Sequence, residues 1–160
     1  MAKASVMKVL VAGDPLLRQV SQPVEKIDKR IIKMLKSMAE TMYAEDGIGL
    51  AAPQVGILKR MVVIDIGDNV LYEMINPVIT KREGSIMNTE GCLSVPEYCG
   101  EVERAENIEC EFTNRNGDRM LLTAGGLLAI AVQHELDHLD GVLFIDKAKT
   151  LMPREELNRE

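Results

Sequence analysis

Apolar residues return at three- and four-residue spacings in two stretches of the chain, and each stretch predicts a helix. The first runs from an Asp28 N-cap to about Tyr43. The second begins near Gly126 and ends at Leu139-Asp140-Gly141, with Gly141 suited to a left-handed C-cap. Because the second stretch is apolar on nearly every side, we expect that helix to be central and buried. The first has a single apolar face, made by Ile31, Ile32, Leu35, Met38 and Met42.

Four segments carry β-branched runs or a two-residue alternation, which are the patterns of strands. They are Met61–Ile66, Leu71–Ile79, Ile108–Thr113 and Met120–Thr123, and a turn at 114–117 joins the last two. Strands first, with two separate helices, favour an α+β fold over a βαβ winding. No repeat, low-complexity segment or linker divides the chain, so residues 1–160 are expected to form a single domain.

The chain carries a formal charge of −6. This argues against general binding to nucleic acid or to an anionic membrane, since both favour a basic surface. No apolar run approaches the roughly 20 residues that span a bilayer, and the apolar stretch at 9–12 is too short for a secretory signal. We therefore expect a cytoplasmic protein, and we expect a monomer. Three cysteines, an odd number, do not suggest a disulfide framework.

Candidate chemistry begins with His134-Glu135-Leu136-Asp137-His138, an HExxH motif on the second predicted helix. Positions four residues apart lie on one helix face, where two imidazoles can share a metal ion. The alternative is a pair of core histidines bonded to backbone carbonyls. The chain has only two histidines, and both stand at ligand spacing beside a glutamate. A metal site is the better interpretation.

A catalytic metal site usually has three protein ligands and one open position. A third histidine six residues after His138 is missing, because Phe144 stands there. A downstream glutamate would have to be Glu155 or Glu156, with no second long helix to present it. A cysteine upstream is the remaining source of the third ligand.

Cys92 is the best of the three cysteines, because it lies in a Gly- and Pro-punctuated segment at 90–96 where backbone can approach a metal closely. Cys110 falls within an alternating strand and is expected in the core. Cys99 stays open as a ligand or a reactive thiol. A set of one thiolate and two imidazoles leaves a divalent ion with net positive charge, which acidifies a bound water.

A third segment, Gly47–Gly56, is rich in glycine, which permits tight turns and close approach of a ligand to the backbone. Within it, Gln54 could donate from a neutral amide to a polarised oxygen, or it could merely satisfy nearby backbone groups. Such a segment after a helix is commonly just a loop, so by itself it is weak evidence.

Together the three segments resemble the signature motifs of the peptide deformylase family. Gly47–Gln54 is similar to its GxGxAAxQ motif, Glu90–Ser94 to its EGCLS motif, and Gln133–His138 to its QHExDH motif. The order and separation of the segments match as well, and the resemblance spans nearly the whole chain. The short passage between the first two motifs is similar to the shorter bacterial class of the family.

The resemblance implies antiparallel β-sheets around a central helix carrying HExxH, with an N-terminal helix and a short C-terminal helix. It implies metal ligation by Cys92, His134 and His138, with Fe2+ as the native ion and Zn2+, Ni2+ or Co2+ as replacements in purified protein. Thiolate and imidazole suit several of these ions, so the ligands alone do not select one.

The activity implied is hydrolysis of the formyl group from N-formylmethionyl nascent peptides, with release of formate. The metal-bound water would be the nucleophile, and Glu135 the general base and then the general acid. As in the family, the Gln54 side chain and the Leu93 backbone N–H would stabilise the oxyanion. Gly49 would offer its backbone to the substrate. The family positions that line the methionine pocket match Ile48, Ile86, Leu127, Ile130 and Ala131.

Other features match the family in part. Glu90 and Arg104 match an ion pair that would steady the Cys92 segment. Many relatives carry an arginine at the position of Cys99, near the substrate path, so this chain is expected to differ in its preference for residues beyond methionine. The mixed charges at 154–160 differ from the basic C-terminal helix with which longer relatives dock on the ribosome, and leave at most a transient ribosome contact.

Two alternatives remain at this point. The chain could be another metal amidase or peptidase that shares HExxH, which would cleave an internal peptide bond. It could also be a degenerate family member that binds metal or formylated chains without turnover.

Overall fold

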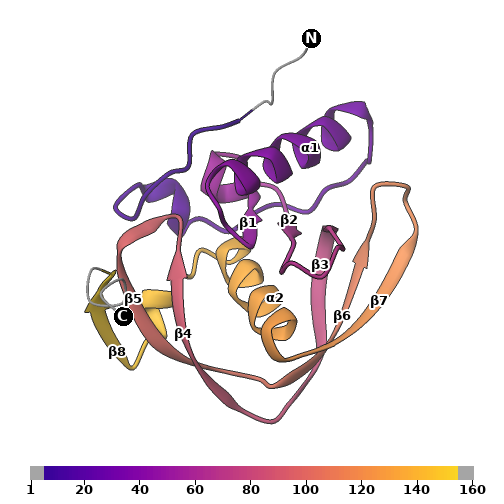
Figure 1. The fold of residues 1–160 in the computed structure, drawn as a ribbon. Coiled ribbons are helices and arrows are strands. Elements are labelled where there is room, and N and C mark those ends of the chain that lie inside the picture. The colour runs from indigo at the N-terminus through magenta and orange to yellow at the C-terminus, as the bar shows by residue number, and fades with distance from the viewer. Residues whose placement is uncertain (1–5, 155–160) are drawn as a thin grey trace.

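Two antiparallel sheets and two helices build the fold (Figure 1). The computed structural model describes residues 6–154. Within them one sheet has the strand order β1-β2-β3-β6-β7 and the other has the order β4-β5-β8. The helices are α1 (Lys29–Ala44) and α2 (Gly126–Leu139), and the strands are β1 (Gly49–Ala51), β2 (Met61–Ile64), β3 (Tyr72–Glu83), β4 (Ile86–Cys92), β5 (Val95–Arg104), β6 (Asn107–Thr113), β7 (Arg119–Gly125) and β8 (Thr150–Pro153). Three short 3-10 turns are η1 (Pro15–Arg18), η2 (Ala52–Val55) and η3 (Phe144–Asp146). The expected α+β class is confirmed.

The larger sheet packs against a hydrophobic core on each of its faces, as strand β2 shows. All four of its residues are buried, because Met61 and Val63 face the core under α1 while Val62 and Ile64 face the core under α2. Successive side chains of a strand point to opposite faces, so a strand that is covered on both sides reads as a continuous apolar run.

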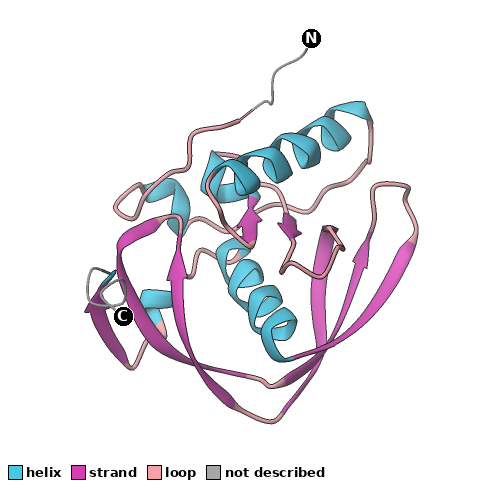
Figure 2. Ribbon diagram, viewed as in Figure 1, coloured by secondary structure: helices cyan, strands magenta, loops and turns pink. Residues whose placement is uncertain are grey.

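Helix α1 packs one face on the sheet and leaves the other exposed (Figure 2). Leu35, Met38 and Met42 are fully buried in the core that α1 shares with β1 and β2. The helix begins where Asp28 accepts a hydrogen bond from the Ile31 backbone N–H at 3.0 Å, which satisfies one of the unpaired amides of the first turn.

The two sheets are joined by a bent, two-stranded ribbon. Strand β3 continues into β4, and β5 continues into β6, so the pair Glu83–Asn107 belongs to one sheet and the pair Ile86–Arg104 to the other. Helix α2 lies inside the bend (Figure 2). Its Gln133 side chain holds the bend at Ala105. The amide donates to the Ala105 carbonyl and the side-chain oxygen accepts from the Ala105 N–H, both at 2.9 Å.

Each predicted element exists, but several extend beyond the predicted bounds. The first helix begins after the predicted N-cap, Asp28, and ends one residue later than predicted, and the strand predicted at 71–79 starts at Tyr72 and runs on to Glu83. Strands β1, β4, β5 and β8 were not predicted. The short C-terminal helix expected from the resemblance lies outside the described residues, after β8 and Arg154. Among residues 6–154 no helix is both long and apolar enough to cross a membrane.

Candidate metal centre

Cys92, His134 and His138 meet in the interior. Cys92 is the last residue of β4, and the two histidines lie one turn apart on α2. One potential ligand atom from each residue lies within 4.8 Å of the other two, and the Cys92 Sγ is 3.4 Å from the His138 Nε2. All three side chains are buried. In residues 6–154 this is the one cluster of three or more such side chains with ligand atoms close enough to share an ion.

The chemistry of this donor set fits a divalent transition metal. One sulfur and two imidazole nitrogens are the donors that zinc and iron accept, and three protein ligands leave a fourth position for water. Two buried atoms nearby, Glu135 Oε1 and His138 Nδ1, have no hydrogen-bond partner in the described structure. Buried polar atoms without partners are rare in folded proteins, so these two indicate a place where a ligand or water belongs.

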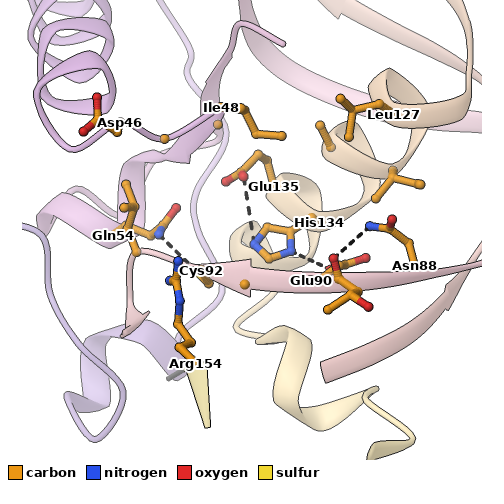
Figure 3. A pocket seen from close by; sticks show the side chains of 17 residues that line it. Asp46, Ile48, Gln54, Asn88, Glu90, Cys92, Leu127, His134, Glu135 and Arg154 are labelled. Atoms are coloured by element: carbon orange, nitrogen blue, oxygen red, sulfur yellow. Dashed lines mark hydrogen bonds and ion pairs between the residues drawn. The ribbon is translucent and has the colours of Figure 1, made fainter. Parts of the chain in front are cut away.

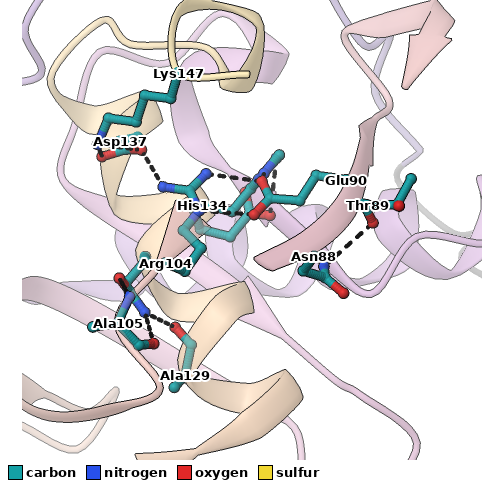
Figure 4. A network of polar contacts seen from close by, with 11 residues as sticks. Asn88, Thr89, Glu90, Arg104, Ala105, Ala129, His134, Asp137 and Lys147 are labelled. Atoms are coloured by element: carbon teal, nitrogen blue, oxygen red, sulfur yellow. Dashed lines mark hydrogen bonds and ion pairs between the residues drawn. The ribbon is translucent and has the colours of Figure 1, made fainter. Parts of the chain in front are cut away.

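His134 is oriented by a chain of buried charges (Figure 4). Its Nδ1 lies 2.7 Å from Glu90 Oε1, and both Glu90 oxygens also accept hydrogen bonds from Arg104, at 2.7 and 2.8 Å. Arg104 makes a further ion pair of 2.7 Å with Asp137, and Lys147 lies 3.1 Å from the same carboxylate. A hydrogen bond at Nδ1 fixes the ring and leaves Nε2 free for a metal.

The charges of this network shift its pKa values. Burial alone would raise the pKa of Glu90, but hydrogen bonds from Arg104 and His134 outweigh it and lower that pKa to about 2. Burial would lower the pKa of His134, yet hydrogen bonds with Cys92 and Glu90 raise it well above its ordinary value. Burial lowers the pKa of His138, and the neighbouring His134 and Arg104 lower it further. In the metal-free protein a proton therefore binds more readily to His134 than to His138.

Glu135 stands beside the three potential ligands. Its Oε2 is 4.0 Å from His134 Nε2, and the side chain is 6% exposed. Burial is the main cause that raises its pKa to about 7. A carboxyl with a pKa near neutrality can both accept and return a proton. Gly49 of β1 makes room for it, since a Cβ there would lie 2.5 Å from Glu135 Oε2.

Gln54, from turn η2, is buried and bonded at both ends of its amide. Its oxygen accepts from the Ala51 N–H at 2.9 Å, which fixes the orientation of the group. Its nitrogen donates to Ser94 Oγ at 3.1 Å and makes a longer contact of 3.5 Å with Cys92 Sγ. The segment before η1 supports both neighbours, because Leu10 donates to the Gln54 carbonyl and Ala12 to the Ser94 carbonyl, each at 2.7 Å.

These groups open into a cavity of about 360 Å³ (Figure 3). Two strands without a second neighbour in their sheets, β1 and β4, contribute backbone to its walls. Ile48 and Leu127 are large apolar side chains that remain exposed at the cavity, at 44% and 47%. Ile86 begins β4 and is not part of the described lining. The lining comprises Asp46, Gly47, Ile48, Gly49, Gln54, Asn88, Thr89, Glu90, Gly91, Cys92, Leu93, Leu127, Ile130, Ala131, His134, Glu135 and Arg154.

The other two cysteines lie away from the cavity lining. Cys110 is fully buried in β6, where burial raises its pKa to about 11. Cys99 is buried in β5, and its Sγ faces the Met152 carbonyl of β8 at 3.8 Å. Neither residue lines the cavity or joins the ligand cluster within the described chain. Of the three cysteines, only Cys92 faces the histidines.

Sequence reasoning missed Asp46, Asn88, Thr89 and Arg154 as lining residues, and Asp137 and Lys147 as supports. The alternation at 86–92, where Glu90 and Cys92 are buried and Met87 is exposed, could have indicated strand β4 and hence Asn88 on the cavity side. No local signal indicates Arg154, because it reaches the cavity only through the pairing of β8 with β5.

Comparison with known proteins decides the family. The sequence profile described as polypeptide deformylase matches residues 6–154. The chain belongs to the peptide deformylase family. A peptide deformylase of Acetivibrio thermocellus is 52% identical over 147 residues, covering 92% of this chain and 86% of the relative. One of Carboxydothermus hydrogenoformans is 48% identical, covering 92% and 97%.

Solved structures of peptide deformylases have the same fold. The crystal structure of the Thermotoga maritima protein has a TM-score of 0.88 at 42% identity and covers 91% of this chain and 99% of its own. The Synechococcus elongatus protein, solved in complex with actinonin, also has a TM-score of 0.88 at 42% identity and covers 99% and 85%. Membership of the peptide deformylase family makes this chain a hydrolase of a metal-dependent family that acts on nascent peptides.

Proposed function

We propose that residues 1–160 form one catalytic domain that removes the formyl group from N-formylmethionyl peptides and releases formate. The observation that carries the proposal is the meeting of three potential metal ligands, a buried carboxyl and a cavity lined in part by apolar side chains at one place. The partners proposed are formylated nascent peptides in the cytoplasm, with at most a transient ribosome contact, and the protein is proposed to act as a monomer.

Cys92, His134 and His138 would hold the metal. The donor set fits Fe2+ as the native ion, and Zn2+, Ni2+ or Co2+ can replace it. When bound, a divalent ion supplies Lewis acidity and lowers the pKa of a ligated water, which provides a nucleophile at neutral pH. The ion pair of Glu90 with Arg104 keeps Glu90 ionised, so Glu90 holds His134 in the tautomer that ligation requires.

Glu135 is proposed as the group that moves the proton. It takes a proton from the attacking water and delivers it to the departing amine, which leaves as the free N-terminus of methionine. Its buried position raises its pKa to about 7 in the metal-free protein, so the site favours a carboxyl that can hold a proton. The unpaired Oε1 is available for this bond without breaking another one.

Gln54 and the Leu93 backbone N–H are proposed to stabilise the oxyanion that develops on the formyl oxygen. The Gln54 amide keeps its bonds to Ala51 and Ser94, and its nitrogen can donate to that oxygen in place of the longer 3.5 Å contact with Cys92 Sγ. One such donor is typically worth about 3–4 kcal/mol in the transition state.

The methionine side chain is proposed to lie against Ile48, Leu127, Ile130 and Ala131, which line the cavity. Binding would cover the two exposed members of this set, and burial of apolar surface contributes about 25 cal/mol for each Å². Ile86 stays proposed as a pocket residue from the resemblance, although it is not among the residues that line the cavity. Gly49 would bond the substrate through its backbone, because it lies on an open strand edge.

The test is formate release from a formyl-Met peptide by protein that is purified without oxygen and loaded with Fe2+ or Ni2+. We expect turnover that stops when a chelator removes the ion. An absence of formate would overturn the proposal, and cleavage of an internal bond in an unformylated peptide would favour a peptidase instead. The metal-loaded protein without substrate gives the background for formate.

A further inference from the structure

Arg154 places a positive charge at the cavity from a strand that has no part in the proposed chemistry. It follows directly on β8, the outer strand of the three-stranded sheet. Among the described residues that line the cavity, it is the one arginine or lysine. Figure 3 shows the Arg154 side chain pointing up toward β4, with Asp46 at the upper left of the view.

The Arg154 guanidinium lies beside Gly91, where β4 has no side chain. A Cβ at Gly91 would stand 3.5 Å from the Arg154 Nη1 and 3.7 Å from its Cζ, which is ordinary contact distance. Gly91 adjoins Cys92, and both residues line the cavity. The charge therefore sits beside the edge of β4 that carries one of the potential ligands.

This guanidinium has no ion pair or hydrogen bond with a described residue. Arg18, Arg60, Arg104, Arg115 and Arg119 each pair with a carboxylate. None of the described acidic residues that line the cavity forms an ion pair with Arg154. Glu90 is already bonded to Arg104 and His134, and Glu135 lies on the α2 side. Asp46 stands on the opposite rim (Figure 3).

A peptide bound as proposed must leave the cavity along an open wall. Strand β4 pairs only with β5, so its other edge is free to bond an extended chain. With the formyl group at the potential ligands and methionine between Ile48 and Leu127, the residues that follow methionine pass the edge of β4 beside Gly91. Their side chains and terminal carboxylate come within the range of Arg154.

We propose that Arg154 determines specificity by binding a carboxylate on the residues that follow methionine. The source is either an acidic side chain or the C-terminal carboxylate of a short peptide, since a guanidinium binds both through the same pair of parallel N–H donors. The inference rests on the proposed function, because it uses that path for the peptide. Arg154 has no role in the chemical step and acts through substrate affinity.

Four formylated peptides separate the two sources: formyl-Met-Ala-Ser as the acid and as the amide, and formyl-Met-Asp-Ser amide and formyl-Met-Ala-Asp amide. The kcat and KM for formate release are measured for the wild type, Arg154→Ala, Arg154→Lys and Arg119→Ala. Arg119 is the matched control, because it lies on β7 and pairs with Glu111 away from the cavity. Equilibrium binding of the unformylated forms of all four peptides is measured in parallel and does not depend on turnover.

We expect the wild type to favour at least one carboxylate peptide over the neutral amide by about twofold to fivefold, through KM, as for an exposed charge pair. Arg154→Ala should remove that preference without a change in kcat, Arg154→Lys should restore part of it, and added salt should weaken it. Equal preference in the wild type and Arg154→Ala, in turnover and in binding, would overturn the inference. A lack of formate from every peptide would instead count against the proposed function, and the binding comparison would still decide the role of Arg154.

Discussion

Helices α1 and α2 differ in how their buried polar side chains are hydrogen-bonded. On α1 the buried polar side chain Thr41 is satisfied close by, because its hydroxyl donates to the Ser37 carbonyl at 2.7 Å and accepts from the Met7 N–H at 2.8 Å. On α2 the buried Gln133 and His134 find their partners on the ribbon, and Glu135 and His138 each keep an atom with no partner. The comparison teaches that α1 stabilises the fold and α2 holds unmet bonding capacity where a ligand belongs.

The largest effect is expected from Glu135, the buried carboxyl of α2. Glu135→Gln keeps the shape of the side chain and removes its proton chemistry, so kcat should fall about 10²–10⁴-fold. Formate release measures the loss, and circular dichroism and metal content check that the fold and the ion remain. Activity within threefold of the wild type would break the contrast between the helices.

The next effect concerns the charges that support α2. Arg104→Ala leaves Glu90 and Asp137 without their buried cation, and breaking such a pair typically costs about 3–5 kcal/mol. The free energy of unfolding in urea measures this loss. The matched control is Arg115→Ala, which breaks an ion pair with Glu73. Because the Arg115 side chain is 40% exposed, this loss should cost less than about 1 kcal/mol. Equal losses in both variants would contradict the prediction.

A substitution in α1 should affect stability and spare catalysis. Leu35 is fully buried in the core that α1 shares with the sheet, so Leu35→Ala should lower the free energy of unfolding by about 2–5 kcal/mol. At a temperature where the variant stays folded, kcat/KM should remain within about twofold of the wild type. A large loss of kcat in folded protein would show that α1 also acts on the site.

The smallest effect is the pH dependence of stability that Glu135 of α2 contributes. Burial raises the pKa of Glu135 from its ordinary 4.5 to about 7 in the folded, metal-free protein. The folded state therefore holds this proton more tightly than the unfolded chain, and stability falls as the pH rises from 4.5 to 7. Glutamine cannot ionise, so metal-free Glu135→Gln should gain up to about 3 kcal/mol over the wild type at pH 8 and nothing at pH 4. Parallel stability curves for the two proteins across this range would rule out the shift.

The helices and half of the strands could be predicted from local pattern, and the reason is physical. Helix α1 has an apolar face and an N-cap, and β2 has a β-branched run, so their own residues specify them. Strand β1 has only three residues, and glycines interrupt β4 and β5 at Gly91 and Gly100. Such strands form because neighbouring chains pair with them, which no single stretch of sequence reveals.

The candidate site was predictable where spacing or chemistry is unusual, and not where topology alone brings residues together. The HExxH spacing indicated His134 and His138, and the short Gly- and Pro-punctuated segment singled out Cys92. The ion pairs of Asp137 with Arg104 and Lys147, and the position of Arg154, depend on the bend of the ribbon and on β8. The roles proposed for Glu135, Gln54 and the pocket residues stay predictions until they are measured.

The bent ribbon restricts where the chain can change in length. From Ile86 to Glu90 strand β4 pairs residue by residue with β5, and one residue added between Glu90 and Cys92 would turn these two side chains to opposite faces. The tip near Asn116, on the hairpin of β6 and β7, lies outside that pairing and can lengthen without moving any ligand atom. Natural insertions and engineered tags are therefore expected to accumulate at that hairpin tip, while the stretch from β4 to β5 keeps a constant number of residues.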